Sequence, residues 1–120
     1  MIFGLGTDII EIERIKKAIA KKNFLNNVFT PAEQDYCNSR GKFSAAASYA
    51  ARFAAKEAFF KALGTGILLP LTNVEIINDE RGVPMINLRG KVAALAESKK
   101  ISLSLSHSHD FATAVCIIEG

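Results

Sequence analysis

The residues best suited to chemistry gather in one short segment, residues 52–61, which reads RFAAKEAFFK. Glu57 and Lys61 are four residues apart, so on a helix they share a face and place a carboxylate beside an ammonium group. Arg52 and Lys56 form a second pair at the same spacing, and both members are cationic. Like charges at this spacing repel each other, which indicates an anion held between them. The alternative is the solvated face of an ordinary amphipathic helix.

Two other segments hold residues that could join this chemistry. Asp8 lies among apolar residues in GTDIIEI, where a carboxylate is costly unless it is paired, caps a turn or binds a metal. With Glu57 it would supply two carboxylates for Mg²⁺, which proteins hold with a few carboxylates, phosphate oxygens and water. His107, at the end of a predicted strand, could donate to a phosphate, act as a general base or be a surface histidine. Adjacent Ser and His residues on a strand point to opposite faces, so they do not form a nucleophilic triad.

The elements that position these groups follow from the spacing of apolar residues, which predicts an α+β fold. We expect a small, mainly antiparallel sheet packed on one long helix and shorter helices. Thr30-Pro31-Ala32-Glu33 is typical of a helix start with a capping box, and Gly64 is typical of a helix end. Strands are predicted at residues 2–11, 74–77, 83–88, 101–106 and 112–118, helices at 12–22, 31–40, 44–63 and 90–99, a connector at 23–29 and a turn at 78–82.

Composition limits the class of protein. The chain has 120 residues and 13.0 kDa, which predicts a single domain over residues 1–120. Its 49% hydrophobic content and mean hydropathy of +0.17 favour an oligomer that buries apolar surface between copies. No apolar run approaches the roughly 18 residues of a membrane span, and the first residues do not resemble a signal peptide. Cys37 and Cys116 are isolated and are predicted to be reduced thiols of a cytoplasmic protein.

The net charge is +3 and the isoelectric point about 9.0, which favours an acidic partner. Basic residues crowd one segment, with Arg14, Lys16, Lys17, Lys21 and Lys22. Such a patch suits an acidic protein, a membrane surface or nucleic acid. Nucleic acid is disfavoured because Phe24 is the only aromatic side chain nearby that could stack on a base. Arg14, Lys17 and Lys21 recur at three and four residues, so we expect them along one side of the first helix.

Five segments together resemble the holo-acyl-carrier-protein synthases, the small phosphopantetheinyl transferases of bacterial fatty-acid synthesis. They are GTDIIEI at 6–12, TPAE at 30–33, RFAAKEAFFKALGTG at 52–66, VEIIND..G.P at 74–84 and LSHS at 105–108. The resemblance implies transfer of 4′-phosphopantetheine from coenzyme A to a serine of apo-acyl carrier protein, with release of adenosine 3′,5′-bisphosphate. It also implies a homotrimer with active sites at subunit interfaces, and no nucleic-acid or membrane partner.

The resemblance further assigns roles to residues of this chain. Asp8 and Glu57 match Mg²⁺ ligands, and Lys61 matches the lysine that contacts the phosphate under attack. The positions that match a coenzyme A site are Arg52, Lys56, Lys61, Gly64, Ser106, His107 and Ser108. The positions that match the surface for the acidic carrier protein are Arg14, Lys17 and Lys21.

At residues 44–49 this chain lacks the basic residues that many relatives carry there. Arg40 and Lys42 could substitute for them, so the resemblance leaves the ligand of the 3′-phosphate open. The acceptor of the serine proton is also open among a metal-bound water, Asp8 and Glu57. We favour the water, because a carboxylate that ligates Mg²⁺ is less basic.

Two other functions fit the same residues. One is a basic oligomeric module that binds acidic proteins or nucleotides without chemistry, for which Asp8 and Glu57 would be dispensable. The other is a magnesium-dependent phosphohydrolase, which would cleave the pyrophosphate of coenzyme A without a carrier protein.

Overall fold

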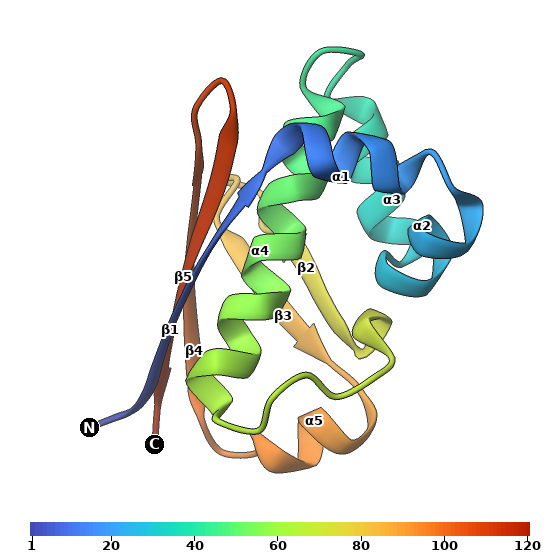
Figure 1. Cartoon of the computed structure of the whole chain (residues 1–120). Coiled ribbons are helices and arrows are strands. Elements are labelled where there is room, and N and C mark those ends of the chain that lie inside the picture. The colour runs from blue at the N-terminus through green and yellow to red at the C-terminus, as the bar shows by residue number, and fades with distance from the viewer.

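One long helix, α4 (Ala45–Leu63), runs through the centre of the molecule, and the other elements pack around it (Figure 1). The structure is a computed structural model that describes residues 1–120. The strands are β1 (Ile2–Glu11), β2 (Val74–Asn78), β3 (Pro84–Leu88), β4 (Lys100–His107) and β5 (Phe111–Glu119). The other helices are α1 (Ile12–Ile19), α2 (Lys22–Val28), α3 (Pro31–Ser39) and α5 (Gly90–Leu95), with a short 3₁₀ turn at Leu71–Asn73.

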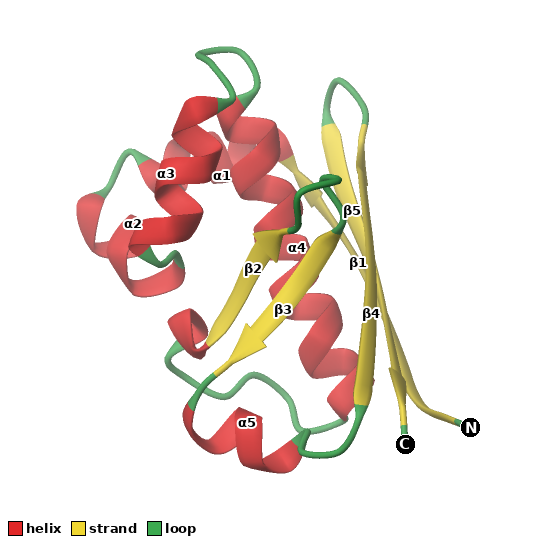
Figure 2. Ribbon diagram, turned by 180° about the vertical axis from the view of Figure 1, so that it is seen from behind, coloured by secondary structure: helices red, strands yellow, loops and turns green.

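The strands form two separate antiparallel sheets, where the sequence predicted a single small one. The larger sheet has the order β1-β5-β4, and the smaller is the β2-β3 hairpin (Figure 2). In the larger sheet Asp8 pairs with Ala114 of β5, and β4 meets β5 through a turn at His109 and Asp110. The predicted α+β class, antiparallel pairing and single long helix are confirmed.

The backbone of β1 lies directly against α4. A Cβ atom added to Gly6 would be 1.9 Å from the carbonyl oxygen of Ala58, and one added to Gly4 would be 1.8 Å from that of Ala62. No side chain fits in that space, so glycine is required at both positions. This close approach brings the carboxyl-terminal half of β1, which carries Asp8, beside the face of α4 that carries Glu57.

Local capping signals place the helices as predicted. The hydroxyl oxygen of Thr30 accepts from the backbone N–H of Glu33 at 3.2 Å, and the carboxylate of Glu33 accepts from the N–H of Thr30 at 2.9 Å. These two bonds are the capping box of α3. Gly64 ends α4 in the left-handed conformation, with φ 82°.

The predicted connector at residues 23–29 is wrong, because residues 22–28 form α2. Phe24, Leu25 and Val28 of this segment pack against the core, and this burial outweighs the low helix propensity of its asparagines. The first helix also ends earlier than predicted, since α1 stops at Ile19 and Lys22 begins α2. Cys37 and Cys116 are buried and free, and none of the helices has the length and apolar character needed to cross a membrane.

Candidate active site

Asp8, Glu57 and Lys61 form one cluster between β1 and α4. The Lys61 ammonium group donates to Asp8 Oδ1 at 3.2 Å and to the carbonyl oxygen of Thr7 at 3.0 Å. The Asp8 side chain is 18% exposed and that of Lys61 is 57% exposed, so a ligand from solvent can reach both. The structure therefore brings together the three residues that the sequence predicted for catalysis.

The electrostatics of Glu57 confirm that the two carboxylates are neighbours. Burial raises the pKa of Glu57, the negative charge of Asp8 raises it further, and Lys61 and Arg14 oppose the shift. Two carboxylates that repel each other beside a single exposed lysine would be stabilised by a cation between them. The chain has no cluster of three or more His, Cys, Asp or Glu residues suited to a metal. A divalent cation on Asp8 and Glu57 would therefore take its remaining ligands from phosphate oxygens and water, as Mg²⁺ does.

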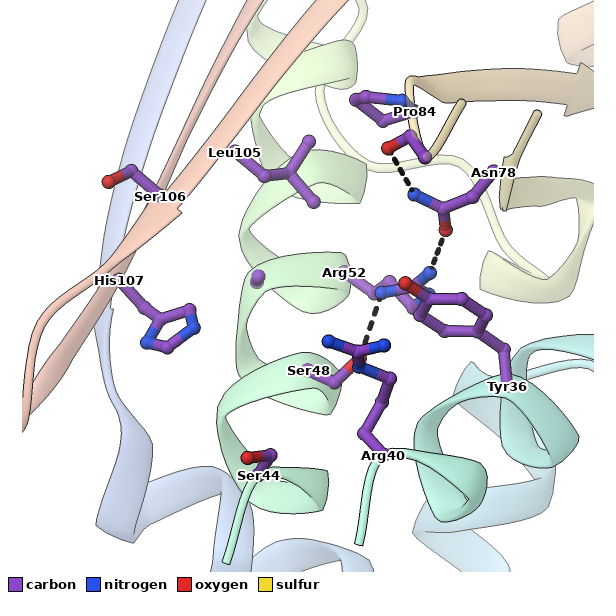
Figure 3. Close-up of a pocket in the computed structure, with 12 residues that line it drawn as sticks. Tyr36, Arg40, Ser44, Ser48, Arg52, Asn78, Pro84, Leu105, Ser106 and His107 are labelled. Carbon is purple, nitrogen blue, oxygen red and sulfur yellow. Dashed lines mark hydrogen bonds between the residues drawn. The ribbon is translucent and has the colours of Figure 1, made fainter. Parts of the chain in front are cut away.

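A second candidate site lies on another side of α4, around Arg52. It is a pocket of about 250 Å³ between α4, the end of α3, the β2-β3 turn and the end of β4 (Figure 3). Arg52 is 4% exposed, and its guanidinium donates to Ser48 and Asn78 and lies over the ring of Tyr36. The residues that line it are Tyr36, Arg40, Ser44, Ser48, Ala51, Arg52, Asn78, Gly82, Pro84, Leu105, Ser106 and His107.

Three of the predicted coenzyme A residues line this pocket, namely Arg52, Ser106 and His107. Ser108 is absent from the lining and instead closes the β4-β5 turn, where its N–H donates to the carbonyl oxygen of Phe111 at 2.8 Å. Gly64 lies one turn of α4 beyond Lys61, at the other end of the helix. The predicted set is thus divided between two places in the chain.

Lys56 belongs to neither place, and the expected anion between Arg52 and Lys56 is a wrong interpretation. The Lys56 ammonium group is 0% exposed and pairs with Glu33 at 2.8 Å. It also donates to the carbonyl oxygens of Val28 at 2.6 Å and Leu71 at 3.2 Å. Its three donors are therefore used inside the protein, so it has none to offer a ligand.

One of the basic residues predicted for a partner, Arg14, lies beside the first cluster. Arg14 and Lys17 are exposed on α1, and Arg14 is close enough to lower the pKa of Glu57. Lys21 is also exposed, but it precedes α2 because α1 ends at Ile19. The expectation of one continuous helical row is corrected to two residues on α1 and one in the following turn.

The two candidate sites face opposite sides of α4. Arg52 and Lys61 are nine residues apart, which is two and a half turns and about 13 Å along the helix. The contacts agree, because Lys61 bonds to β1 and Arg52 bonds to β2. One small ligand cannot contact both side chains within one subunit without passing around the helix.

Several lining residues of the second site have no counterpart in the sequence prediction. Tyr36, Ser48 and Asn78 come from three different elements, and no local pattern links them. Asn78 does lie in the segment VEIIND..G.P, which carried part of the resemblance without an assigned role.

Comparison with known proteins identifies the family. The family model of the 4′-phosphopantetheinyl transferase superfamily matches residues 4–116. The chain belongs to this superfamily. Holo-[acyl-carrier-protein] synthase of Syntrophus aciditrophicus is 46% identical over 127 residues, which cover 100% of this chain and 98% of the relative.

Solved structures of the same enzyme family share the fold. The crystal structure of holo-[acyl-carrier-protein] synthase from Neisseria meningitidis superposes with a TM-score of 0.89 at 34% identity, over 100% of both chains. That of a holo-(acyl-carrier-protein) synthase from Bacillus anthracis, in complex with CoA (3′,5′-ADP), gives a TM-score of 0.84 at 35% identity over 100% of this chain and 98% of that one. The resemblance noted in the sequence therefore holds over the whole transferase fold.

Proposed function

We propose that this chain transfers the 4′-phosphopantetheine group of coenzyme A to a serine of apo-acyl carrier protein, in the presence of Mg²⁺. Adenosine 3′,5′-bisphosphate is the second product. The observation that carries this proposal is the cluster of Asp8, Glu57 and Lys61, which sits in a transferase fold whose Bacillus anthracis relative was solved with CoA. The holo-carrier would then serve fatty-acid synthesis.

The reaction joins the serine oxygen to the phosphorus that carries pantetheine and breaks the bond from that phosphorus to the bridging pyrophosphate oxygen. Mg²⁺ held by Asp8 and Glu57 would neutralise charge on the phosphate oxygens. Lys61 supplies a positive charge at the same place, and its exposed ammonium group can exchange the carbonyl oxygen of Thr7 for a phosphate oxygen. The proton of the incoming serine would pass to a metal-bound water, which is more basic than a carboxylate that holds Mg²⁺.

The carrier protein would dock on the basic residues Arg14, Lys17 and Lys21. Carrier proteins of this class are acidic, and exposed cations steer an acidic partner toward the surface that bears them. Arg14 acts on the pKa of Glu57, so a carrier bound there would hold its serine close to the two carboxylates.

Assembly into a homotrimer would complete the site. Because Arg52 and Lys61 face opposite sides of α4, one coenzyme A can contact both kinds of group only if two subunits contribute. The outer face of the β1-β5-β4 sheet supports the same proposal, since its strands β1 and β5 expose large apolar side chains that nothing covers within one chain. Its exposed side chains are Phe3, Leu5, Ile9, Phe111 and Val115. The cytoplasm, where coenzyme A and reduced thiols occur together, is the proposed compartment.

One incubation separates this proposal from its two alternatives. The protein is mixed with coenzyme A, MgCl₂ and apo-acyl carrier protein, and the carrier is weighed by mass spectrometry. A carrier heavier by one phosphopantetheine group supports the proposal. An unchanged carrier with intact coenzyme A would indicate a binding module, and cleavage of coenzyme A without carrier would indicate a phosphohydrolase.

A further inference from the structure

Arg52 is a buried cation without a buried anion. Its side chain forms no ion pair, and its Nε is the one buried side-chain nitrogen or oxygen in the chain that lacks a hydrogen-bond partner. In the pocket its guanidinium contacts Ser48, Asn78 and the Tyr36 ring, the last at 4.2 Å. A charge removed from water is costly unless a counter-ion offsets the lost hydration. The charge of Arg52 therefore makes the pocket suitable for an anion.

The other residues around the pocket also favour an anion. Arg40 also lines it, with its guanidinium 5.7 Å from the centre of the same Tyr36 ring, and His107 points toward α4 from β4 (Figure 3). No Asp or Glu is among the lining residues. Guanidinium groups in this setting select planar or tetrahedral oxyanions, of which phosphate is the best match.

Asn78 is the residue that holds the Arg52 guanidinium without neutralising its charge. Its side-chain oxygen accepts from Arg52, and its side-chain nitrogen donates to the carbonyl oxygen of Gly82 at 3.0 Å, so it is fixed on both sides (Figure 3). An amide orients the guanidinium but leaves its charge unneutralised, whereas a carboxylate at the same place would neutralise it. We propose that Asn78 is a positioning residue that aims Arg52 at a phosphate group of the substrate and sets the affinity for that phosphate.

This inference rests on the proposed function, because coenzyme A supplies the phosphate. Coenzyme A has a pyrophosphate, where transfer occurs, and a monophosphate on the 3′ carbon of its ribose. The pyrophosphate belongs with Lys61 and the two carboxylates. The pocket of Arg52 lies on the other side of α4 and holds no carboxylate, so the 3′-phosphate is its partner.

Two variants of Asn78 test the positioning role. Asn78→Asp and Asn78→Ala both lose the bond to Gly82, so the comparison between them isolates the contact with Arg52. Binding of adenosine 3′,5′-bisphosphate and of adenosine 5′-monophosphate is measured by calorimetry, alongside KM and kcat with coenzyme A and with 3′-dephospho-coenzyme A. We expect Asn78→Asp to lower affinity for the bisphosphate about 10- to 100-fold, the range of one charge-assisted hydrogen bond, with little change for the monophosphate.

The order of the variants carries the test. If a carboxylate competes with the phosphate for Arg52, the preference for the bisphosphate over the monophosphate falls from the wild type to Asn78→Ala and further to Asn78→Asp. KM for coenzyme A should rise in the same order, and kcat should stay nearly constant. A purely structural role predicts the reverse order for the two variants, because aspartate keeps the shape and adds an ion pair to Arg52. That reverse order, or equal losses for both nucleotides, would overturn the proposal.

Ser48 offers a second route that leaves the β2-β3 turn intact. Its hydroxyl accepts from Arg52 Nη1 at 3.0 Å from one helical turn away, so Ser48→Asp also brings a carboxylate to the guanidinium. We expect the same selective loss of affinity for the bisphosphate with Ser48→Asp, and a smaller loss with Ser48→Ala, which removes the hydrogen bond without adding a carboxylate. A folded Ser48→Asp variant that keeps the full bisphosphate preference would overturn the proposal even if Asn78→Asp does not fold. Failure of the wild type to modify a carrier would instead contradict the proposed function, and the nucleotide preference could still be measured.

Discussion

The contact between Gly6 and α4 predicts how a single added methyl group should affect the enzyme. In Gly6→Ala the new Cβ would lie 1.9 Å from the carbonyl oxygen of Ala58, against the 3.0 Å below which real contacts essentially never occur. β1 and α4 must therefore separate by about 1 Å, and both partners are backbone, so neither can rotate away. Overpacking of this kind costs about 1–3 kcal/mol. For a domain of this size the cost lowers Tm by roughly 5–15 °C.

The same displacement should reach the active site, because Asp8 lies two residues beyond Gly6 and Lys61 one turn beyond Ala58. The bond of 3.2 Å between Asp8 and Lys61 spans the gap that would widen. A misplacement near 1 Å can cost about 100-fold in rate, so we expect a fall in kcat of that order in the folded variant.

The assays for Gly6→Ala are thermal unfolding and initial rates of carrier modification, both below the variant's Tm. Gly120→Ala is the matched control, since its new Cβ would meet Phe3 Cβ at 3.6 Å, an ordinary contact. The control should resemble the wild type in both assays. A Gly6→Ala variant with the Tm and kcat of the control would refute the view that this contact positions the site.

Three further perturbations test the charges and surfaces of the protein. Glu57→Gln should abolish transfer. Because the pKa of Glu57 is raised in the folded protein, its carboxyl group contributes stability at low pH that is lost as the pH rises through that pKa. The variant should therefore raise the Tm of the metal-free protein at pH 7 but not at pH 4, and a lower Tm at pH 7 would contradict this. The double variant Arg14→Glu/Lys21→Glu should have a higher KM for the carrier at low salt, while KM for coenzyme A changes little. The difference in carrier KM between variant and wild type should shrink as salt is added, and an unchanged carrier KM would place docking elsewhere. Ile9→Asp on the exposed sheet face should prevent assembly of the proposed trimer in sedimentation and remove activity, and a fully active monomer would contradict the proposed shared site.

Local signals in the sequence predicted the elements and the first cluster. The capping box of Thr30 and Glu33 and the helix end at Gly64 depend on neighbouring residues, so they could be recognised from the sequence alone. Glu57 and Lys61 share a helix face by spacing. The chemistry of a carboxylate among apolar residues suggested Asp8 as a partner of Glu57, but the spacing in the sequence could not show it, because their distance in space depends on how β1 packs against α4.

Long-range partners explain what the sequence did not predict. Lys56 was expected to face a ligand, but Glu33, 23 residues earlier, turns inward to pair with it and also accepts from the N–H of Ile76. The capping role of Glu33 was visible in the sequence, and its second role was not. The pocket around Arg52 likewise joins residues of α3, β2 and β4 whose proximity no periodicity reveals.

The stoichiometry of one reaction tests the proposed transfer most directly. Apo-acyl carrier protein, coenzyme A and MgCl₂ are incubated with the wild-type protein, and holo-carrier and adenosine 3′,5′-bisphosphate are quantified together by liquid chromatography and mass spectrometry. Transfer predicts equal amounts of the two products at every time point and neither product when the carrier is omitted. Adenosine 3′,5′-bisphosphate formed without carrier, or no holo-carrier formed with it, would contradict the proposed function.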